Sequence, residues 1–85
     1  MLVIVNLAAT RETLPIETLE KVDSALATSG FRKEVRSVIK PGRQYSVTYD
    51  GPNREKNQIE EILRPFADEG MFTFSVEVEE SVKFP

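Results

Sequence analysis

The stretch Phe72-Thr73-Phe74-Ser75-Val76-Glu77-Val78-Glu79 decides the fold, because apolar and polar side chains alternate along it without a break. Successive side chains of a β-strand point to opposite faces, so the apolar residues share one face and the polar residues share the other. A strand with one buried and one hydrated face is typical of an antiparallel sheet that is covered on one side. The sequence therefore predicts a strand of this kind at residues 72–79.

Three further segments are predicted to be strands. Residues 1–8 are apolar at both parities, which favours a central position in the sheet. Residues 44–50 alternate cleanly, whereas residues 31–39 alternate poorly. The turn-forming sequence Lys40-Pro-Gly-Arg43 lies between these two segments, so together they are expected to form a hairpin.

Two registers are open to this hairpin. A tight connection pairs Val47 with Arg36, whereas a five-residue loop at residues 40–44 shifts the pairing by one residue. Such a slip exchanges the two faces of a strand. We favour the longer loop, because it gathers apolar side chains on one face: Val35, Ile39, Tyr45, Val47 and Tyr49.

The first predicted helix covers residues 15–29. Pro15 suits the first turn of a helix, where its missing N–H is no loss, and Gly30 suits a left-handed C-terminal cap. The apolar side chains between them recur at helical spacing: Ile16, Leu19, Val22 and Leu26.

The second predicted helix starts after Asn53, a good N-cap, and extends no further than Gly70. Pro65 should kink it or end its regular part near residue 64. Its apolar stripe consists of Ile59, Ile62, Leu63 and Phe66. Residues 82–85, after the last strand, are expected to form a loose tail.

The order strand, helix, strand, strand, helix, strand is the ferredoxin-like βαββαβ pattern. It predicts an α+β fold with a four-stranded antiparallel sheet in the order 4-1-3-2 and both helices on one face. A chain of 85 residues suits one domain that spans residues 1–85.

The sheet face without helices is expected to be a binding surface. Leu2, Ile4 and Asn6 are placed on this face of the first strand, and its two aliphatic residues need a cover. A second copy of the chain is one cover, and exposed aliphatic residues tolerated in water are the alternative. The other strands are expected to add Arg32, Glu34, Arg36, Val38, Ser46, Thr48, Thr73, Ser75, Glu77 and Glu79.

Charge is distributed unevenly, although the whole chain has a net charge of -3. Residues 31–56 carry seven basic against three acidic side chains, and the remainder carries four against eleven. A basic hairpin is the minimum requirement for phosphate binding, and an edge strand protected from aggregation is the alternative explanation. The residues predicted to bind a partner are Leu2, Ile4, Arg32, Arg36, Lys40 and Arg43.

Residue types that carry most catalytic and metal chemistry are missing. The chain has no Cys and no His, and its paired carboxylates are neighbours in sequence that do not face each other. The first strand carries no aromatic side chain for base stacking, and Tyr45 and Tyr49 are assigned to the core. The sequence predicts neither a catalytic site nor a cofactor or metal.

The first apolar stretch, Met1 to Val5, is too short to span a membrane and lacks the features of a signal peptide. We therefore expect a cytoplasmic protein that does not associate with membranes.

The chain resembles two groups of small ferredoxin-like dimers, the GhoS-type antitoxins and the CRISPR-associated nuclease-like proteins. The matching features are Met1-Leu-Val-Ile-Val5, Ser29-Gly30-Phe31, Tyr45-Ser-Val47 and a second helix before a terminal strand. The resemblance implies a dimer that contacts nucleic acid through the hairpin. The nuclease-like group has an aspartate at the end of its first strand, where this chain has Asn6, so the resemblance does not carry over metal-dependent cleavage.

These observations lead to two functional hypotheses. The first is a small, non-catalytic, dimeric module that binds another macromolecule, such as a protein, as a regulator or inhibitor. The alternative is an antitoxin-like protein that binds or cleaves RNA.

Overall fold

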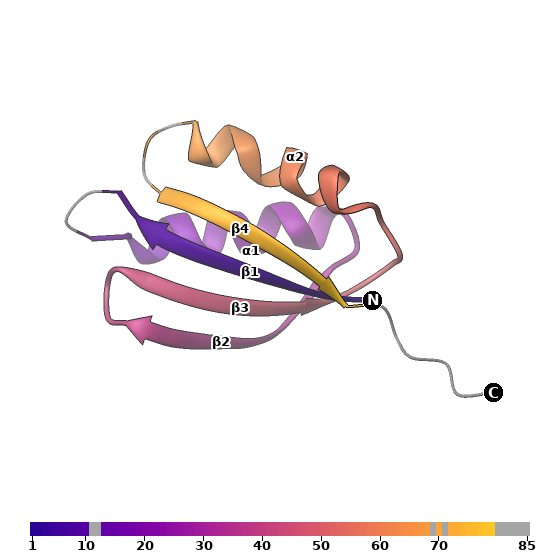
Figure 1. Cartoon of the computed structure of the whole chain (residues 1–85), viewed down its shortest axis with the longest axis horizontal. Helices are drawn as coiled ribbons and strands as arrows, with labels where there is room; N and C mark the ends of the chain where they lie inside the picture. Colours follow the sequence, from indigo (N-terminus) through magenta and orange to yellow (C-terminus); the bar gives the residue numbers. More distant parts are fainter. Residues whose placement is uncertain (11–12, 69, 71, 80–85) are drawn as a thin grey trace.

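The computed structural model describes residues 1–10, 13–68, 70 and 72–79. The predicted loose tail at residues 82–85 lies outside these residues. Six elements follow one another in the predicted order (Figure 1): β1 (Leu2–Ala9), α1 (Ile16–Thr28), β2 (Arg32–Lys40), β3 (Gln44–Asp50), α2 (Lys56–Ala67) and β4 (Phe72–Glu79).

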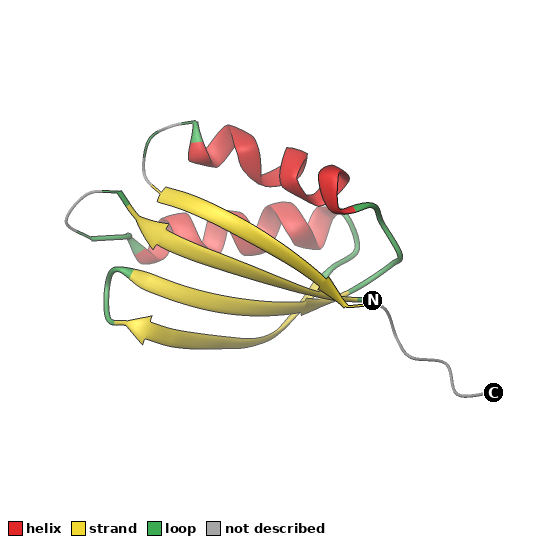
Figure 2. Ribbon diagram, viewed as in Figure 1, coloured by secondary structure: helices red, strands yellow, loops and turns green. Residues whose placement is uncertain are grey.

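The four strands form one antiparallel sheet in the order β2-β3-β1-β4, which confirms the predicted ferredoxin-like α+β fold. Both helices lie on the same side of the sheet, so its other face is uncovered (Figure 2). We call this uncovered side the open face. The most apolar strand, β1, lies between β3 and β4, as its sequence predicts.

The core lies between the helices and three of the four strands. Val5 on β1, Val47 on β3 and Val76 on β4 are directly paired across the sheet and are all buried. They pack with the predicted helical stripes, represented by Leu19 of α1 and Ile59 of α2. None of the buried apolar residues in the described part of the chain comes from β2. This edge strand therefore extends beyond the core.

The favoured register of the β2–β3 hairpin is wrong. Arg36 is paired with Val47, which is the register of the tight connection, and only residues 41–43 lie between the strands. Gly42 has a φ of 73°, which glycine tolerates better than other residues. Its carbonyl accepts a hydrogen bond from the Leu14 N–H at 2.7 Å, so the turn is also attached to the chain that leads into α1.

Two irregularities in β2 explain why simple alternation fails there. The register with β3 shifts between Lys33 and Val35 and again between Val38 and Lys40. Each shift inserts one extra residue, Glu34 or Ile39, and each reverses the parity of the residues that follow. An alternation read along the whole strand cannot detect such insertions.

The helix boundaries agree with the prediction except at α2. This helix starts later than predicted, because Glu55 rather than Asn53 is its N-cap. Glu55 and Gln58 form a reciprocal capping box. The helix continues through Pro65 to Ala67, so it does not end near residue 64, and it stops before Gly70 as predicted.

Gly51 is required by close packing against Phe31. A Cβ atom at this position would lie 2.3 Å from the Phe31 ring, and Phe31 is buried in the core. We predict that Gly51→Ala lowers the free energy of unfolding by about 1–3 kcal/mol, because the ring or the backbone must move. Chemical denaturation measures this loss.

A double-mutant cycle provides the control for this packing. In a Phe31→Leu background the ring is absent, so Gly51→Ala should cost clearly less than it does in the natural chain. Equal costs in the two backgrounds would contradict the proposed contact.

Candidate interaction surface

The open face has a layout that follows from the strand pairing. One row of directly paired residues crosses all four strands on this face: Val35, Thr48, Ile4 and Glu77. The next row consists of uncharged polar residues: Ser37, Ser46, Asn6 and Ser75. Leu2 and Ile4 lie on this face, as predicted, because the residues beside them on β1 point into the core.

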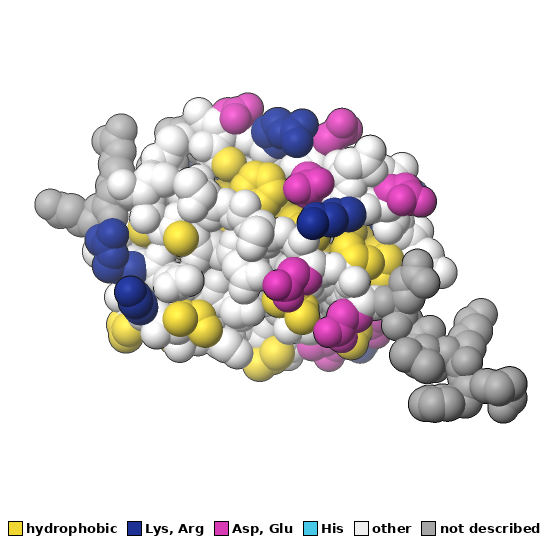
Figure 3. All heavy atoms as spheres, in the orientation of Figure 1, with side chains coloured by type: hydrophobic (Ala, Val, Ile, Leu, Met, Phe, Trp, Pro, Cys, Tyr) yellow, Lys and Arg dark blue, Asp and Glu magenta, His cyan; other side chains and the backbone are white. Residues whose placement is uncertain are grey.

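Exposed apolar side chains are concentrated on the edge strand β2. Val35, Val38 and Ile39 keep 53, 56 and 55 % of their surface exposed, and we call these three residues the β2 surface. Figure 3 shows hydrophobic atoms along the lower border of the molecule, over this strand. Leu2 on the open face is less exposed, at 38 %. Large apolar side chains gathered on one edge are typical of a surface that binds a protein.

The sequence prediction missed the β2 surface because it assigned Val35 and Ile39 to the core. In the observed register Val35 is paired with Thr48 on the open face, and Val38 is paired with Tyr45 on the helix side. Val38 had been placed on the open face, which is also wrong. The signal that would have found the register is the turn itself, because Pro41-Gly42 suits a short connection.

A carboxylate on α1 holds the middle of β2. The hydroxyl of Tyr49 donates a hydrogen bond to Oδ1 of Asp23 at 2.5 Å. Arg36 donates from Nη2 to Oδ2 at 2.6 Å, and Lys33 approaches the same oxygen at 3.3 Å. One carboxylate therefore joins α1 to β2 and β3, and we call these four residues the Asp23 clamp.

The Asp23 clamp changes the role of one predicted partner-binding residue. Arg36 was expected on the open face, but it lies on the helix side, because it is paired with the buried Val47. Its side chain is 23 % exposed and its charge is matched by Asp23. Arg36 thus belongs to the Asp23 clamp, and its predicted place on the open face is wrong.

Burial and the contact with a negative charge both act on Tyr49. Its ring is in the core, and loss of the hydroxyl proton would place a second negative charge beside Asp23. Burial, followed by the hydrogen bond to Asp23, raises the pKa of Tyr49 far above its ordinary value. The hydroxyl is therefore a permanent donor in the folded protein.

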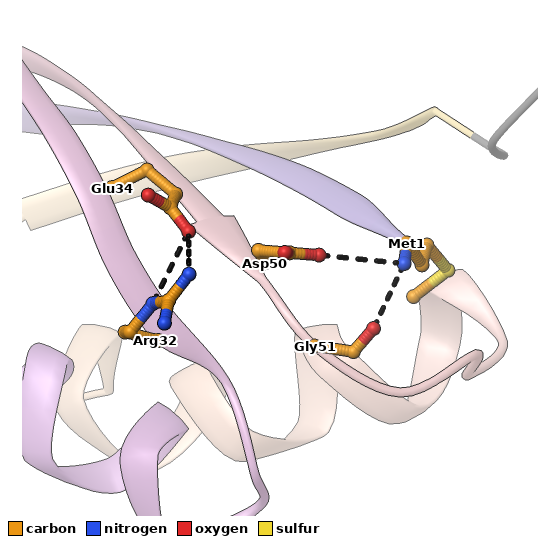
Figure 4. A network of polar contacts seen from close by, with 5 residues as sticks. All are labelled: Met1, Arg32, Glu34, Asp50 and Gly51. Carbon is orange, nitrogen blue, oxygen red and sulfur yellow. Dashed lines mark hydrogen bonds and ion pairs between the residues drawn. The ribbon is translucent and has the colours of Figure 1, made fainter.

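At the Arg32 end of β2, oppositely charged groups form pairs near Met1 (Figure 4). Arg32 donates to Oε1 of Glu34 from Nη2 at 2.7 Å and from Nε at 3.2 Å. The Met1 amino group donates to the Gly51 carbonyl at 2.8 Å and lies 3.6 Å from Asp50. Arg32 is exposed on the open face, as predicted, but its nearest charge belongs to the same strand.

The remaining predicted cations lie at the hairpin turn. Lys40 ends β2 opposite Gln44, and Arg43 lies in the connection, with its backbone carbonyl bound by the Ala9 N–H at 2.7 Å. Both side chains are exposed. Three other cations of the basic hairpin face carboxylates of this chain: Arg32, Lys33 and Arg36.

The polar side chains of the open face form no cluster for catalysis. Asn6, which lies within β1, donates to the hydroxyl of Ser75 at 3.3 Å. Tyr49 is buried and Tyr45 is half-buried, and Tyr45 accepts the Gly42 N–H through its hydroxyl. Within the described ranges, no three acidic side chains come together as a metal site.

Two comparisons with known proteins found no match for this chain. No family model matches it, and no curated protein matches it either. No helix in the described part of the chain has the length and apolar character needed to cross a membrane. The site must therefore be interpreted from its own residues.

Removal of the central carboxylate tests the Asp23 clamp. We predict that Asp23→Asn lowers the free energy of unfolding by about 2 kcal/mol, since it weakens charge-assisted hydrogen bonds at a largely buried position. Denaturant titration checks this value. Glu20→Gln, at an exposed carboxylate on the same helix α1, is the control and should leave stability unchanged, and an equal loss in both variants would contradict the clamp.

The raised pKa of Tyr49 predicts a dependence of stability on pH. Below the ordinary tyrosine pKa of about 10 its contribution is complete, and it is lost as the pH rises toward the higher pKa of the folded state. In Tyr45→Phe, whose one tyrosine is Tyr49, phenolate absorbance should appear only when the protein unfolds. Phenolate formation near pH 10 in a folded protein, verified by circular dichroism, would contradict this account.

Proposed function

We propose that this protein is a small, non-catalytic module that binds another protein through the β2 surface. The observation that carries the proposal is the exposure of Val35, Val38 and Ile39 on a strand that contributes nothing to the core. A chain that needed these residues only for its own stability would bury them. Their burial by a partner would remove apolar surface from water, which is favourable.

The strand itself supports the same function. The outer edge of β2 has no neighbouring strand in the described sheet, so backbone N–H and C=O groups along this edge are available to another chain. An extended segment can add to such an edge by backbone hydrogen bonds, while side chains set the specificity. The sheet and the apolar side chains thus supply two sources of affinity at one place.

The lack of catalytic residue types agrees with a binding role. The whole sequence contains neither His nor Cys, which supply most general bases, nucleophiles and metal ligands. The regulatory or inhibitory role, the dimer and the cytoplasmic location expected from the sequence remain parts of this proposal.

The RNA-binding alternative, which the resemblance to GhoS-type antitoxins suggests, has weaker support. Electrostatic attraction to phosphates requires cations that are not already matched. The carboxylates Glu34 and Asp23 face Arg32, Lys33 and Arg36. Val35 lies between Glu34 and Arg36, and Ile39 directly precedes Lys40. These exposed apolar side chains favour an apolar partner.

Site-specific photo-cross-linking in the native cell tests the protein-binding function. A photoreactive amino acid at position 38 should give a discrete cross-linked species with protein. The matched control is position 16, because Ile16 is also an exposed apolar residue, at 65 %, but belongs to α1. Cross-links of equal yield at both positions, or none at position 38, would contradict the proposal.

A nucleic-acid titration at low salt tests the alternative. We predict no shift of single- or double-stranded RNA or DNA at protein concentrations in the micromolar range. Lys40→Ala/Arg43→Ala is the informative variant, because Asp23→Asn and Arg36→Ala would also disturb the fold. If RNA or DNA binds in a salt-sensitive way and this variant abolishes the binding, nucleic-acid binding replaces protein binding as the proposed function.

A further inference from the structure

We infer that the partner at the β2 surface is a second copy of this chain, bound antiparallel to β2 about a two-fold axis that passes Ser37. This inference rests on the proposed function and names its partner. Pairing of this kind joins two four-stranded sheets into one continuous sheet, with both open faces on the same side. It extends the sheet by the same backbone hydrogen bonds that hold β2 to β3.

Among the described residues, the exposed large apolar side chains at the edges of the sheet belong to β2. On the other edge strand, β4, Phe72 and Val76 are buried in the core, and the residues on the open face are polar or acidic. On β2 the apolar side chains are unburied. Pairing of two β2 strands therefore removes apolar surface from water that pairing of two β4 strands does not.

The middle of β2 lacks the devices that normally protect an edge. Lysines and bulges that discourage pairing are typical of edge strands. In β2 the bulges lie at Glu34 and Ile39, so residues 35–38 run in regular register with β3. The one charge in this segment, on Arg36, is turned to Asp23 on the helix side.

Geometry limits the position of the two-fold axis. Directly opposed residues of antiparallel strands lie on the same face of the joint sheet. An axis at Val35 opposes Lys33 and Ser37, which lie on different faces because their partners on β3 are Tyr49 and Ser46. An axis nearer to either end of β2 passes through a bulge. An axis at Val38 opposes Arg36 and Lys40, which also lie on different faces because their partners on β3 are Val47 and Gln44. Two positions remain: Arg36 and Ser37.

Charge then selects one of these positions. An axis at Arg36 opposes the two copies of Arg36, and also Arg32 and Lys40, which are like charges. An axis at Ser37 opposes Glu34 of one copy with Lys40 of the other, twice. Opposite charges across an interface favour the correct register, and like charges disfavour the other.

The same position also brings the apolar residues together. With the axis at Ser37, Val35 of one copy faces Ile39 of the other, and Arg36 faces Val38. The two small serines meet at the axis. The β2 surfaces of the two copies therefore cover each other, and this arrangement names the residues that an experiment can exchange.

Charge reversal tests the interface directly. Light scattering coupled to size-exclusion chromatography should give twice the mass of the 9.6 kDa chain. Glu34→Lys and Lys40→Glu should each weaken the dimer by about tenfold or more, because each turns two attractive contacts into repulsive ones. The double variant should regain the dimer, and an equimolar mixture of the two single variants should form a mixed dimer.

A disulfide test gives the position of the axis without relying on charge. The natural chain has no cysteine, so Ser37→Cys introduces a single thiol where two copies meet. Opposed residues of antiparallel strands are close enough for a disulfide. Oxidation should therefore yield a cross-linked dimer of Ser37→Cys, whereas Ser75→Cys, an exposed position on the other edge strand β4, should not.

The outcomes separate this inference from the proposed function. Restored dimers in the double variant together with a disulfide at position 37 support the inference. A monomer at tens of micromolar, or a dimer that neither charge reversal affects, overturns it. If the species cross-linked at position 38 contains a different protein, the inference fails while the protein-binding function stands.

Discussion

The three donors that converge on Asp23 determine the character of the edge strand. Asp23 lies on α1, and its carboxylate binds Tyr49 of β3 together with Arg36 and Lys33 of β2. Because Arg36 must face α1 to make this contact, the observed register of β2 on β3 is favoured over one shifted by a single residue, which would turn Arg36 to the open face. That register leaves Val35 on the open face and Val38 beyond the core.

Most of the fold follows from the sequence, because residues that alternate or recur at helical spacing are placed by burial alone. The elements β3 and β4 have their predicted bounds, and Leu19, Val22 and Leu26 of the predicted α1 stripe face the core, whereas Ile16 is exposed. The edge strand could not be predicted in this way. Glu34 and Ile39 are extra residues relative to β3, and the burial that sets a register in the centre of a sheet is absent at its edge.

The candidate site was predicted only in part, and for the same reason. Leu2 and Ile4 are on the open face, because β1 is regular and its other parity is buried. On the β2 surface, the prediction that Val35 and Ile39 lie in the core is wrong, and so is the prediction that Val38 lies on the open face. The assignment of Arg36 to the open face failed because a charge in sequence does not reveal that a carboxylate thirteen residues earlier lies beside it.

Charge, register and binding are therefore connected, because the contacts of Asp23 favour a register of β2 that leaves its apolar side chains exposed. Internal ion pairs engage three of the seven cations of residues 31–56, and the middle of the edge is left with exposed apolar side chains. The most direct test is hydrogen exchange of the β2 backbone amides, measured by NMR at several protein concentrations. The account predicts that protection of amides within residues 35–39 rises with concentration, whereas protection in β1 does not change. Protection of β2 that is the same at all concentrations would contradict it.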